Sequence, residues 1–163
     1  MEQNSNYFRW MENVNIKNLH DFNNKTKWFT KIEPTKEFTH SDAVCYTKDN
    51  RKITVELKTR KETNEQFKGW GDVIIEPKKL SHFTDVMESG YTLNENCLYI
   101  NFTANGAIIY SFNDLKTPAR IYPNHRQWNP GKRKYEFETR IGLDIKDAII
   151  YHINEDSNYV RET

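Results

Sequence analysis

Short apolar runs, each about the length of a β-strand, constrain the fold of this chain more than any other feature. They alternate with polar segments rich in Pro, Gly, Asn and Asp, which favour turns. The predicted strands are residues 28–32, 42–48, 52–59, 73–75, 97–102, 107–112, 119–122, 135–141 and 148–153. No run approaches the roughly 18–20 apolar residues that a membrane span needs. We therefore expect a protein that does not enter a membrane.

Two segments have helical periodicity instead. Residues 7–22 place apolar side chains, Leu19 and Phe22 among them, on one stripe of a helix. Pro77 suits the first position of a second helix, and Gly90 supplies its stop. The order helix, strands, helix, strands predicts an α+β or mixed α/β fold with a central mixed β-sheet flanked by helices.

Length and composition narrow the class of protein further. With 163 residues and a net charge of +1, the chain fits a single domain spanning 1–163. Its two cysteines lie far apart and its five histidines are scattered, which argues against a disulfide framework, structural zinc, haem and thiol catalysis. The N-terminal residues lack the features of a signal peptide, so we expect a cytoplasmic protein. The many asparagines are typical of an AT-rich genome, such as that of a phage or bacterium.

The strongest chemical signal lies in residues 52–58. The apolar residues Ile53, Val55 and Leu57 alternate there with Thr54, Glu56 and Lys58. Because side chains alternate along a strand, the first set predicts a core face and the second set the opposite face. A carboxylate and an ammonium group on an otherwise buried strand need an explanation, since burying unpaired charge is costly.

Asp42, at the start of the preceding strand, lies fourteen residues before Glu56. A loop of odd length over residues 49–51 closes residue 48 on 52, which aligns Asp42 with Lys58 and keeps it on the face of Glu56. A two-residue loop would send Asp42 to the core face. The hydrophobic pattern favours the odd loop, although a β-bulge would change the count.

Two carboxylates that meet at one point form an oxygen-rich site suited to Mg²⁺ or Mn²⁺. A nearby lysine can orient or deprotonate a water molecule, or stabilise charge on a phosphate. The pattern Ser41-Asp42 followed by Glu56-Leu57-Lys58 resembles the PD-(D/E)xK nuclease superfamily.

The resemblance implies a restriction-endonuclease-like core at about residues 7–112, with a C-terminal β extension at about 113–163. It further implies catalytic Asp42, Glu56 and Lys58, and metal binding by Asp42, Glu56 and the carbonyl of Leu57. Members often carry an acidic residue in the first helix and a Gln or Lys in the helix after the motif. The supporting candidates are Glu12, Lys78 and Lys79. Ser41 departs from the family's frequent proline.

A basic segment follows the second helix. Residues 113–140 contain seven Lys or Arg against three acidic residues. We expect a loop at 122–134 in which lysine and arginine neutralise phosphates and Trp128 stacks on a base. The candidate nucleic-acid contacts are Arg126, Trp128, Lys132, Arg133 and Lys134. A solvated loop with a tucked Trp128 is the alternative.

The leading hypothesis is a metal-dependent endonuclease that hydrolyses DNA with Mg²⁺ or Mn²⁺, and it is compatible with a homodimer. A second hypothesis is a catalytically inactive nuclease-like fold that binds nucleic acid or a protein partner. A third treats residues 97–153 as a distinct β-module for protein interaction.

Overall fold

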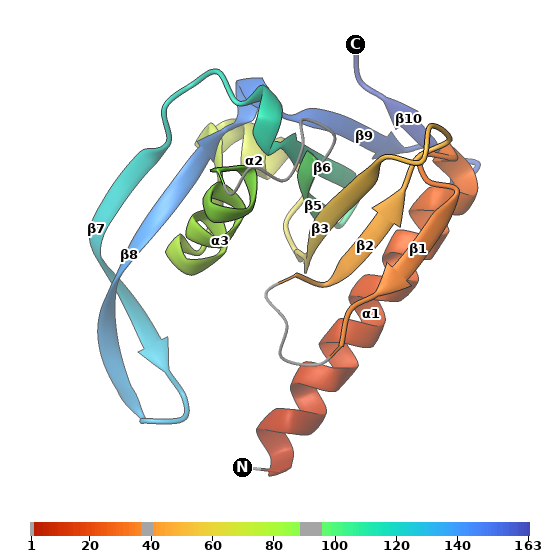
Figure 1. Cartoon of the computed structure of the whole chain (residues 1–163). Coiled ribbons are helices and arrows are strands. Elements are labelled where there is room, and N and C mark those ends of the chain that lie inside the picture. Colours follow the sequence, from red (N-terminus) through yellow and green to blue (C-terminus); the bar gives the residue numbers. More distant parts are fainter. Residues whose placement is uncertain (1, 37–40, 89–95) are drawn as a thin grey trace.

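The computed structural model describes residues 2–36, 41–88 and 96–163, and these form two β-sheets and three α-helices (Figure 1). The large sheet has seven strands in the order β1-β2-β3-β5-β6-β9-β10. These are β1 (Lys31–Pro34), β2 (Ala43–Tyr46), β3 (Lys52–Thr59), β5 (Asn96–Thr103), β6 (Gly106–Ser111), β9 (Ile149–Ile153) and β10 (Tyr159–Arg161). The β3–β5 pair is parallel and the other pairs are antiparallel, so the sheet is mixed.

The small sheet has three antiparallel strands in the order β4-β8-β7. Its strands are β4 (Asp72–Ile75), β7 (Arg120–Asn129) and β8 (Lys134–Asp144). The helices are α1 (Glu2–Thr26), α2 (Asn64–Trp70) and α3 (Pro77–Glu88), with short 3₁₀ turns at Phe112–Asp114 and Ile145–Asp147. These elements confirm the predicted α+β class with a mixed central sheet. Within the described residues, no helix is both long and apolar enough to cross a membrane.

Two buried clusters lie on opposite faces of the large sheet. On one face, Leu19 and Phe22 of α1 pack against Val55 and Leu57 of β3. On the other face, a second cluster joins β5 and β6 to α2, β4 and β8. The predicted core face of β3 is therefore confirmed, and Glu56 lies on the face that points toward the small sheet and α3.

The helix predicted at 7–22 is confirmed and lies within the longer α1. The predicted strand at 28–32 begins later, at Lys31, because Trp28 packs against Phe22 and donates a hydrogen bond to the Tyr151 hydroxyl at 2.8 Å. The start of α3 at Pro77 is confirmed, whereas its predicted stop, Gly90, lies outside the described residues.

Two elements were not predicted. Helix α2 occupies part of the polar segment at 60–71, and only Asn64 and Phe67 of it are buried, so its apolar signal is small. A capping box between Thr63 and Gln66 starts it, and Gly71 ends it with a φ of 83°. Strand β10 has only three residues and pairs with β9.

The predicted pairing of residue 48 with 52 is wrong, because Tyr46 pairs with Lys52. The loop is longer than expected: Thr47 and Arg51 close it by hydrogen bonds, and Asn50 adopts a left-handed φ of 56°. Its length is still odd, so residues of equal parity still pair, as Val44 does with Thr54. The shift of two residues leaves the faces unchanged and brings Asp42 level with the Glu56 region instead of Lys58.

The loop predicted at 122–134 is also wrong. Residues 120–129 form β7 and residues 134–144 form β8, so only the tight turn at 130–133 lies outside a strand. The full length of β7 was not predicted, because Pro123 argues against a strand at this position: proline is rare inside a sheet. The structure accommodates it at an irregularity in the pairing between Tyr122 and His125. We call residues 120–144 the arm; Figure 1 shows it curving past α3 and away from the large sheet.

Candidate functional site

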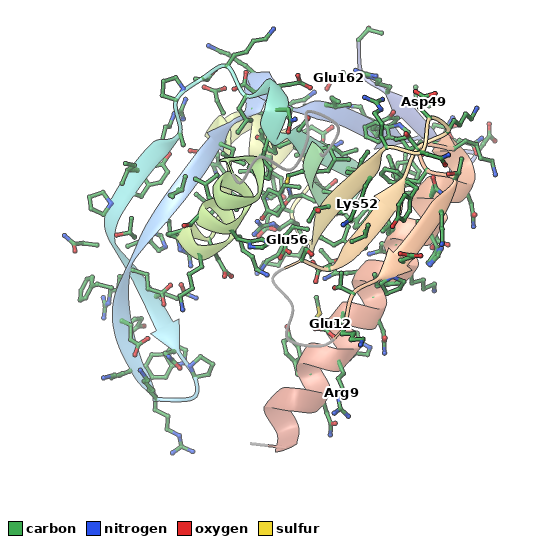
Figure 2. The ribbon with its side chains drawn as sticks, in the orientation of Figure 1. Arg9, Glu12, Asp49, Lys52, Glu56 and Glu162 are labelled. Carbon is green, nitrogen blue, oxygen red and sulfur yellow. The ribbon has the colours of Figure 1, made fainter. Side chains whose placement is uncertain are left out.

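Glu56 is a buried acid in the middle of the molecule. Its side chain is 9% exposed and extends from β3 toward α3, where Oε1 lies 3.1 Å from Nζ of Lys79 (Figure 2). The other oxygen, Oε2, is buried and has no hydrogen-bond partner. A buried carboxylate oxygen without a partner is costly, so this group favours either a proton or a bound cation.

Burial raises the pKa of the Glu56 carboxyl to about 8, and the nearby Asp42 carboxylate contributes to the rise. Lys79 and Lys58 oppose it. Because desolvation and a second negative charge both disfavour ionisation, Glu56 is largely protonated at neutral pH unless a cation compensates its charge.

Asp42 lies just before β2 and is fixed by its backbone and by its side chain. Its N–H donates to the carbonyl of Val55 at 3.0 Å. Its Oδ2 accepts a hydrogen bond from the N–H of Leu57 at 2.8 Å. The two contacts hold the Asp42 carboxylate against the strand segment that carries Glu56.

Lys58 and the start of α3 surround this pair with charge. Nζ of Lys58 lies 3.7 Å from a carboxylate oxygen of Glu76, just before α3, and both side chains are largely exposed. Lys78 and Lys79 occupy the first turn of α3, which contains no acidic residue. Cations are disfavoured at a helix N-terminus by the helix dipole, so this arrangement suits a site that holds negative charge.

A cleft of about 620 Å³ opens beside Lys58. Its walls come from the end of β3, from β4 and the start of α3, and from the arm. Lining residues include Lys58, Arg60, Glu76, Tyr99, Gln127 and Arg140. A second hollow of about 460 Å³ shares Gln127 and Glu138 with the cleft and continues toward the arm tip and Tyr7 of α1. Together they border the inner side of the arm from Lys58 to its tip.

Glu12 lies on α1, away from Glu56 in Figure 2. It lines a small hollow of about 160 Å³ together with Ser41 and Asp42. The structure thus brings Glu12 toward Asp42, whereas Lys58 borders the cleft on the arm side. Asp42 lines the small hollow, and neither Asp42 nor Glu56 is among the residues that line the cleft.

The arm carries the residues expected to contact nucleic acid. Arg126 and Trp128 lie on β7, Lys132 and Arg133 in the turn, and Lys134 begins β8. Nζ of Lys132 lies 3.0 Å from Glu136. At the base of the arm, Arg120 bridges two buried acids, Asp72 at 3.7 Å and Asp144 at 3.5 Å. The ion pair with Asp72 anchors the arm to β4, and the ion pair with Asp144 links the two strands of the arm.

Two residues of the site, Glu76 and Arg60, were not predicted from the sequence. Glu76 pairs with Lys58. Arg60 donates to the hydroxyl of Tyr99 and to the carbonyl of Ile74, both at 2.8 Å, and so forms one wall of the cleft. Arg60 continues the alternation of Glu56 and Lys58 along β3 by two residues, and that spacing could have identified it.

The donors suited to a divalent cation are the carboxylates of Asp42 and Glu56. In the part of the chain that the structure describes, no group of three or more His, Cys, Asp or Glu side chains is arranged to hold a metal ion. The unpartnered Oε2 of Glu56 and the all-oxygen chemistry of this pair nevertheless fit Mg²⁺ or Mn²⁺ better than a softer metal.

The sequence was compared with protein-family models and with curated proteins, and neither comparison gives a function for this site. No protein-family model matches the chain, and neither does any curated protein.

Proposed function

We propose that this protein is a metal-dependent endonuclease of the PD-(D/E)xK type, with a restriction-endonuclease-like core, that hydrolyses DNA. The observation that carries the proposal is the Glu56 carboxyl. It is buried and has an unpartnered oxygen. It lies beside the Asp42 carboxylate, which a hydrogen bond from the Leu57 N–H holds in place. The fold gains no stability from burying the Glu56 carboxyl with an unpartnered oxygen beside a second acid, so a ligand that compensates the charge is the simplest reason for it.

Asp42 and Glu56 would hold Mg²⁺ or Mn²⁺, and the carbonyl of Leu57 would supply a third oxygen. The N–H and C=O groups of one strand residue point to the same side of the strand. Because the Leu57 N–H donates to Asp42, its carbonyl is expected on that side as well. When bound, such a cation supplies a Lewis acid that stabilises charge on the scissile phosphate.

The protein's own groups have separate tasks in this proposal. Glu56 would lose its proton to solvent on binding a cation, since the positive charge would offset the burial that raises its pKa. Lys58, at the edge of the cleft, orients the attacking water molecule and stabilises charge on the phosphate. DNA occupies the cleft between β3 and the arm, where Arg60 and Arg140 are available to its backbone.

Cleavage of a supercoiled plasmid in Mg²⁺ or Mn²⁺ tests this proposal. We expect activity in the wild type and a strong loss in Glu56→Gln and Lys58→Ala. Glu155→Gln and Lys48→Ala, which change exposed residues outside the cleft, serve as matched controls. Wild-type activity in the Glu56 and Lys58 variants, or none in a well-folded wild type, would refute the enzymatic role.

A second candidate function is a nuclease-like fold that binds nucleic acid without cutting it. The ion pair between Lys79 and Glu56 favours this candidate, because an internal cation already compensates part of the Glu56 charge. Calorimetric titration with Mn²⁺ separates the two functions. Binding that disappears in Glu56→Gln supports the nuclease, and absence of binding supports the non-catalytic binder.

A further inference from the structure

One face of the arm presents aromatic rings to solvent. Trp128 pairs with Tyr135 across the two strands, and Arg126 pairs with Phe137. Residues directly opposite each other in an antiparallel pair share a face, so these four side chains form one row. The exposed fractions of the three ring residues are 49% for Trp128, 52% for Tyr135 and 67% for Phe137.

The contacts within the row divide these side chains into two kinds. The Arg126 guanidinium carbon lies 3.7 Å from the centre of the Tyr135 ring, which fixes the cation by a cation–π contact. Trp128 meets Tyr135 edge-on, with ring centres 5.1 Å apart and planes at 66°. Tyr135 therefore supports its two neighbours, whereas Trp128 and Phe137 keep much of their surface open.

A contribution to the stability of the arm explains some of the side chains in this row but not all of them. A cross-strand aromatic pair such as Trp128 and Tyr135 stabilises a two-stranded ribbon. Phe137 lies opposite Arg126 and belongs to neither buried cluster. An exposed phenylalanine gains little from folding, which indicates a ligand that uses open rings and a fixed cation together.

We propose that this face is a base-stacking platform for single-stranded DNA. Bases would stack on Trp128 and Phe137, and Arg126, held by Tyr135, would contact the phosphate between them. The local charge is complementary to such a ligand, because residues 113–140 carry seven basic and three acidic residues. Rings that flank a cation suit a polyanion with aromatic bases better than a purely apolar protein surface.

The inference deepens the proposed function and rests on it for the choice of DNA. The cleft lies along the arm, and the second hollow continues from it toward the arm tip. Gln127 and Glu138, which line the cleft, alternate with the row along the two strands and so lie on the other face of the arm, whereas Trp128 also borders the second hollow near the tip. A substrate with an unpaired stretch next to its duplex would therefore reach the platform by passing around the arm tip. The predicted substrate class is therefore branched or frayed DNA, not a continuous duplex.

Fluorescence anisotropy in EDTA tests the platform without any cleavage. The probes are a labelled single-stranded oligonucleotide, the matching blunt duplex, and a single-stranded RNA of the same sequence. We expect Trp128→Ala and Phe137→Ala each to weaken single-stranded DNA binding by roughly 5- to 150-fold, with duplex binding changed by less than about twofold. Ile121→Ala, which removes a 69% exposed apolar side chain from the arm base, is the matched control and should bind as the wild type does.

Conservative variants separate stacking from arm stability. Phe137→Tyr keeps a ring and should retain binding, whereas Phe137→Leu keeps apolar volume and should lose it. Wild-type binding in Trp128→Ala and Phe137→Ala would overturn the platform, and so would equal losses in Ile121→Ala. Tighter binding of RNA than of DNA would overturn the choice of DNA.

Glu56→Gln, measured in parallel, distinguishes this inference from the nuclease proposal. The platform predicts that Glu56→Gln binds single-stranded DNA as the wild type does, whatever its cleavage activity. An inactive wild type with ring-dependent binding would refute the nuclease and retain the platform. An active wild type with ring-independent binding would do the reverse.

Discussion

The carboxylate of Asp42 accepts a hydrogen bond from the backbone N–H of Leu57, with 2.8 Å between Oδ2 and N. Leu57 is 2% exposed and its side chain lies in the core beneath α1. One acid thus completes the backbone bonding of a buried strand and places its charge next to Glu56. The Asp42 side chain therefore has a structural role, as a hydrogen-bond acceptor, and a chemical role, as a negative charge beside Glu56. Different substitutions can remove one role and keep the other.

Asp42→Asn should keep the stability of the fold and abolish the proposed cleavage activity, whereas Asp42→Ala should lower both. Asparagine retains an oxygen that can accept from the Leu57 N–H, and alanine leaves that buried donor without a partner. We expect Asp42→Ala to lower the free energy of unfolding by about 1–3 kcal/mol, and Asp42→Asn by clearly less. Urea denaturation measures this difference. Equal destabilisation by the two substitutions would show that the hydrogen bond is not the stabilising contact.

The raised pKa of Glu56 predicts how stability depends on pH. The folded protein holds this proton up to about pH 8, whereas the unfolded chain releases it near its ordinary pKa, about 4.3. Between these values the folded state binds more protons, so Glu56 makes stability fall as pH rises. Glu56→Gln should remove this fall and be more stable than the wild type at pH 8 by a few kcal/mol at most (on the order of 1.4 kcal/mol per pKa unit).

Urea denaturation of both proteins from pH 5 to pH 9 in EDTA checks the prediction. A constant difference across this range would show that Glu56 does not titrate as the geometry predicts. Adding Mg²⁺ should stabilise the wild type and not Glu56→Gln, because a ligand that binds only the folded state shifts the equilibrium toward it.

Lys79→Met should raise the pKa of Glu56 further. The ammonium lies 3.1 Å from Oε1 and lowers the pKa of this carboxyl, so its removal favours the protonated form. Lys78→Met is the matched control, since Lys78 is the neighbouring lysine of the same helix turn and is exposed. Carbon-13 NMR of the glutamate carboxyl carbons follows the titration. An unchanged midpoint in Lys79→Met would contradict the ion pair.

Lys132, Arg133 and Lys134 should contribute phosphate contacts that do not depend on sequence. Replacing all three by alanine should reduce the slope of log K against log salt for duplex DNA by roughly 0.9 per lost contact. Unfolding free energy should change by less than about 0.5 kcal/mol for each exposed charge, although Lys132 also pairs with Glu136. Anisotropy across a salt series measures the slope, with Lys48→Ala as the control. A wild-type slope in the triple variant would show that the arm tip does not bind DNA.

The local pattern of β3 predicted much of the candidate site. Strict alternation fixed which side chains share a face, so Glu56 and Lys58 could be separated from the core residues without a structure. The parity argument for the hairpin also holds, although the loop is two residues longer than predicted. A two-residue slip preserves the faces, which explains why an incorrect register still placed Asp42 near Glu56.

The arm could not be predicted in the same way. Pro123 and the polar turn at 130–133 interrupt the pattern that identifies a strand. Pairing with the neighbouring strand keeps β7 extended where its own sequence does not predict a strand. Residues 125–129 of β7 pair continuously with 134–138 of β8. A row such as Trp128, Tyr135 and Phe137 exists only once this pairing is set.

By itself, the sequence determined the α+β class, the two faces of β3, the start of α3, and a carboxylate pair with a nearby lysine. These depend on short-range periodicity and turn chemistry, which neighbouring residues decide. Only the tertiary structure decided the burial of Glu56, its ion pair with Lys79, the Asp42–Leu57 hydrogen bond and the cleft beside the arm. The physical reason is that desolvation and ion pairing depend on which distant segments exclude water from a group, and chain-local patterns do not contain that information.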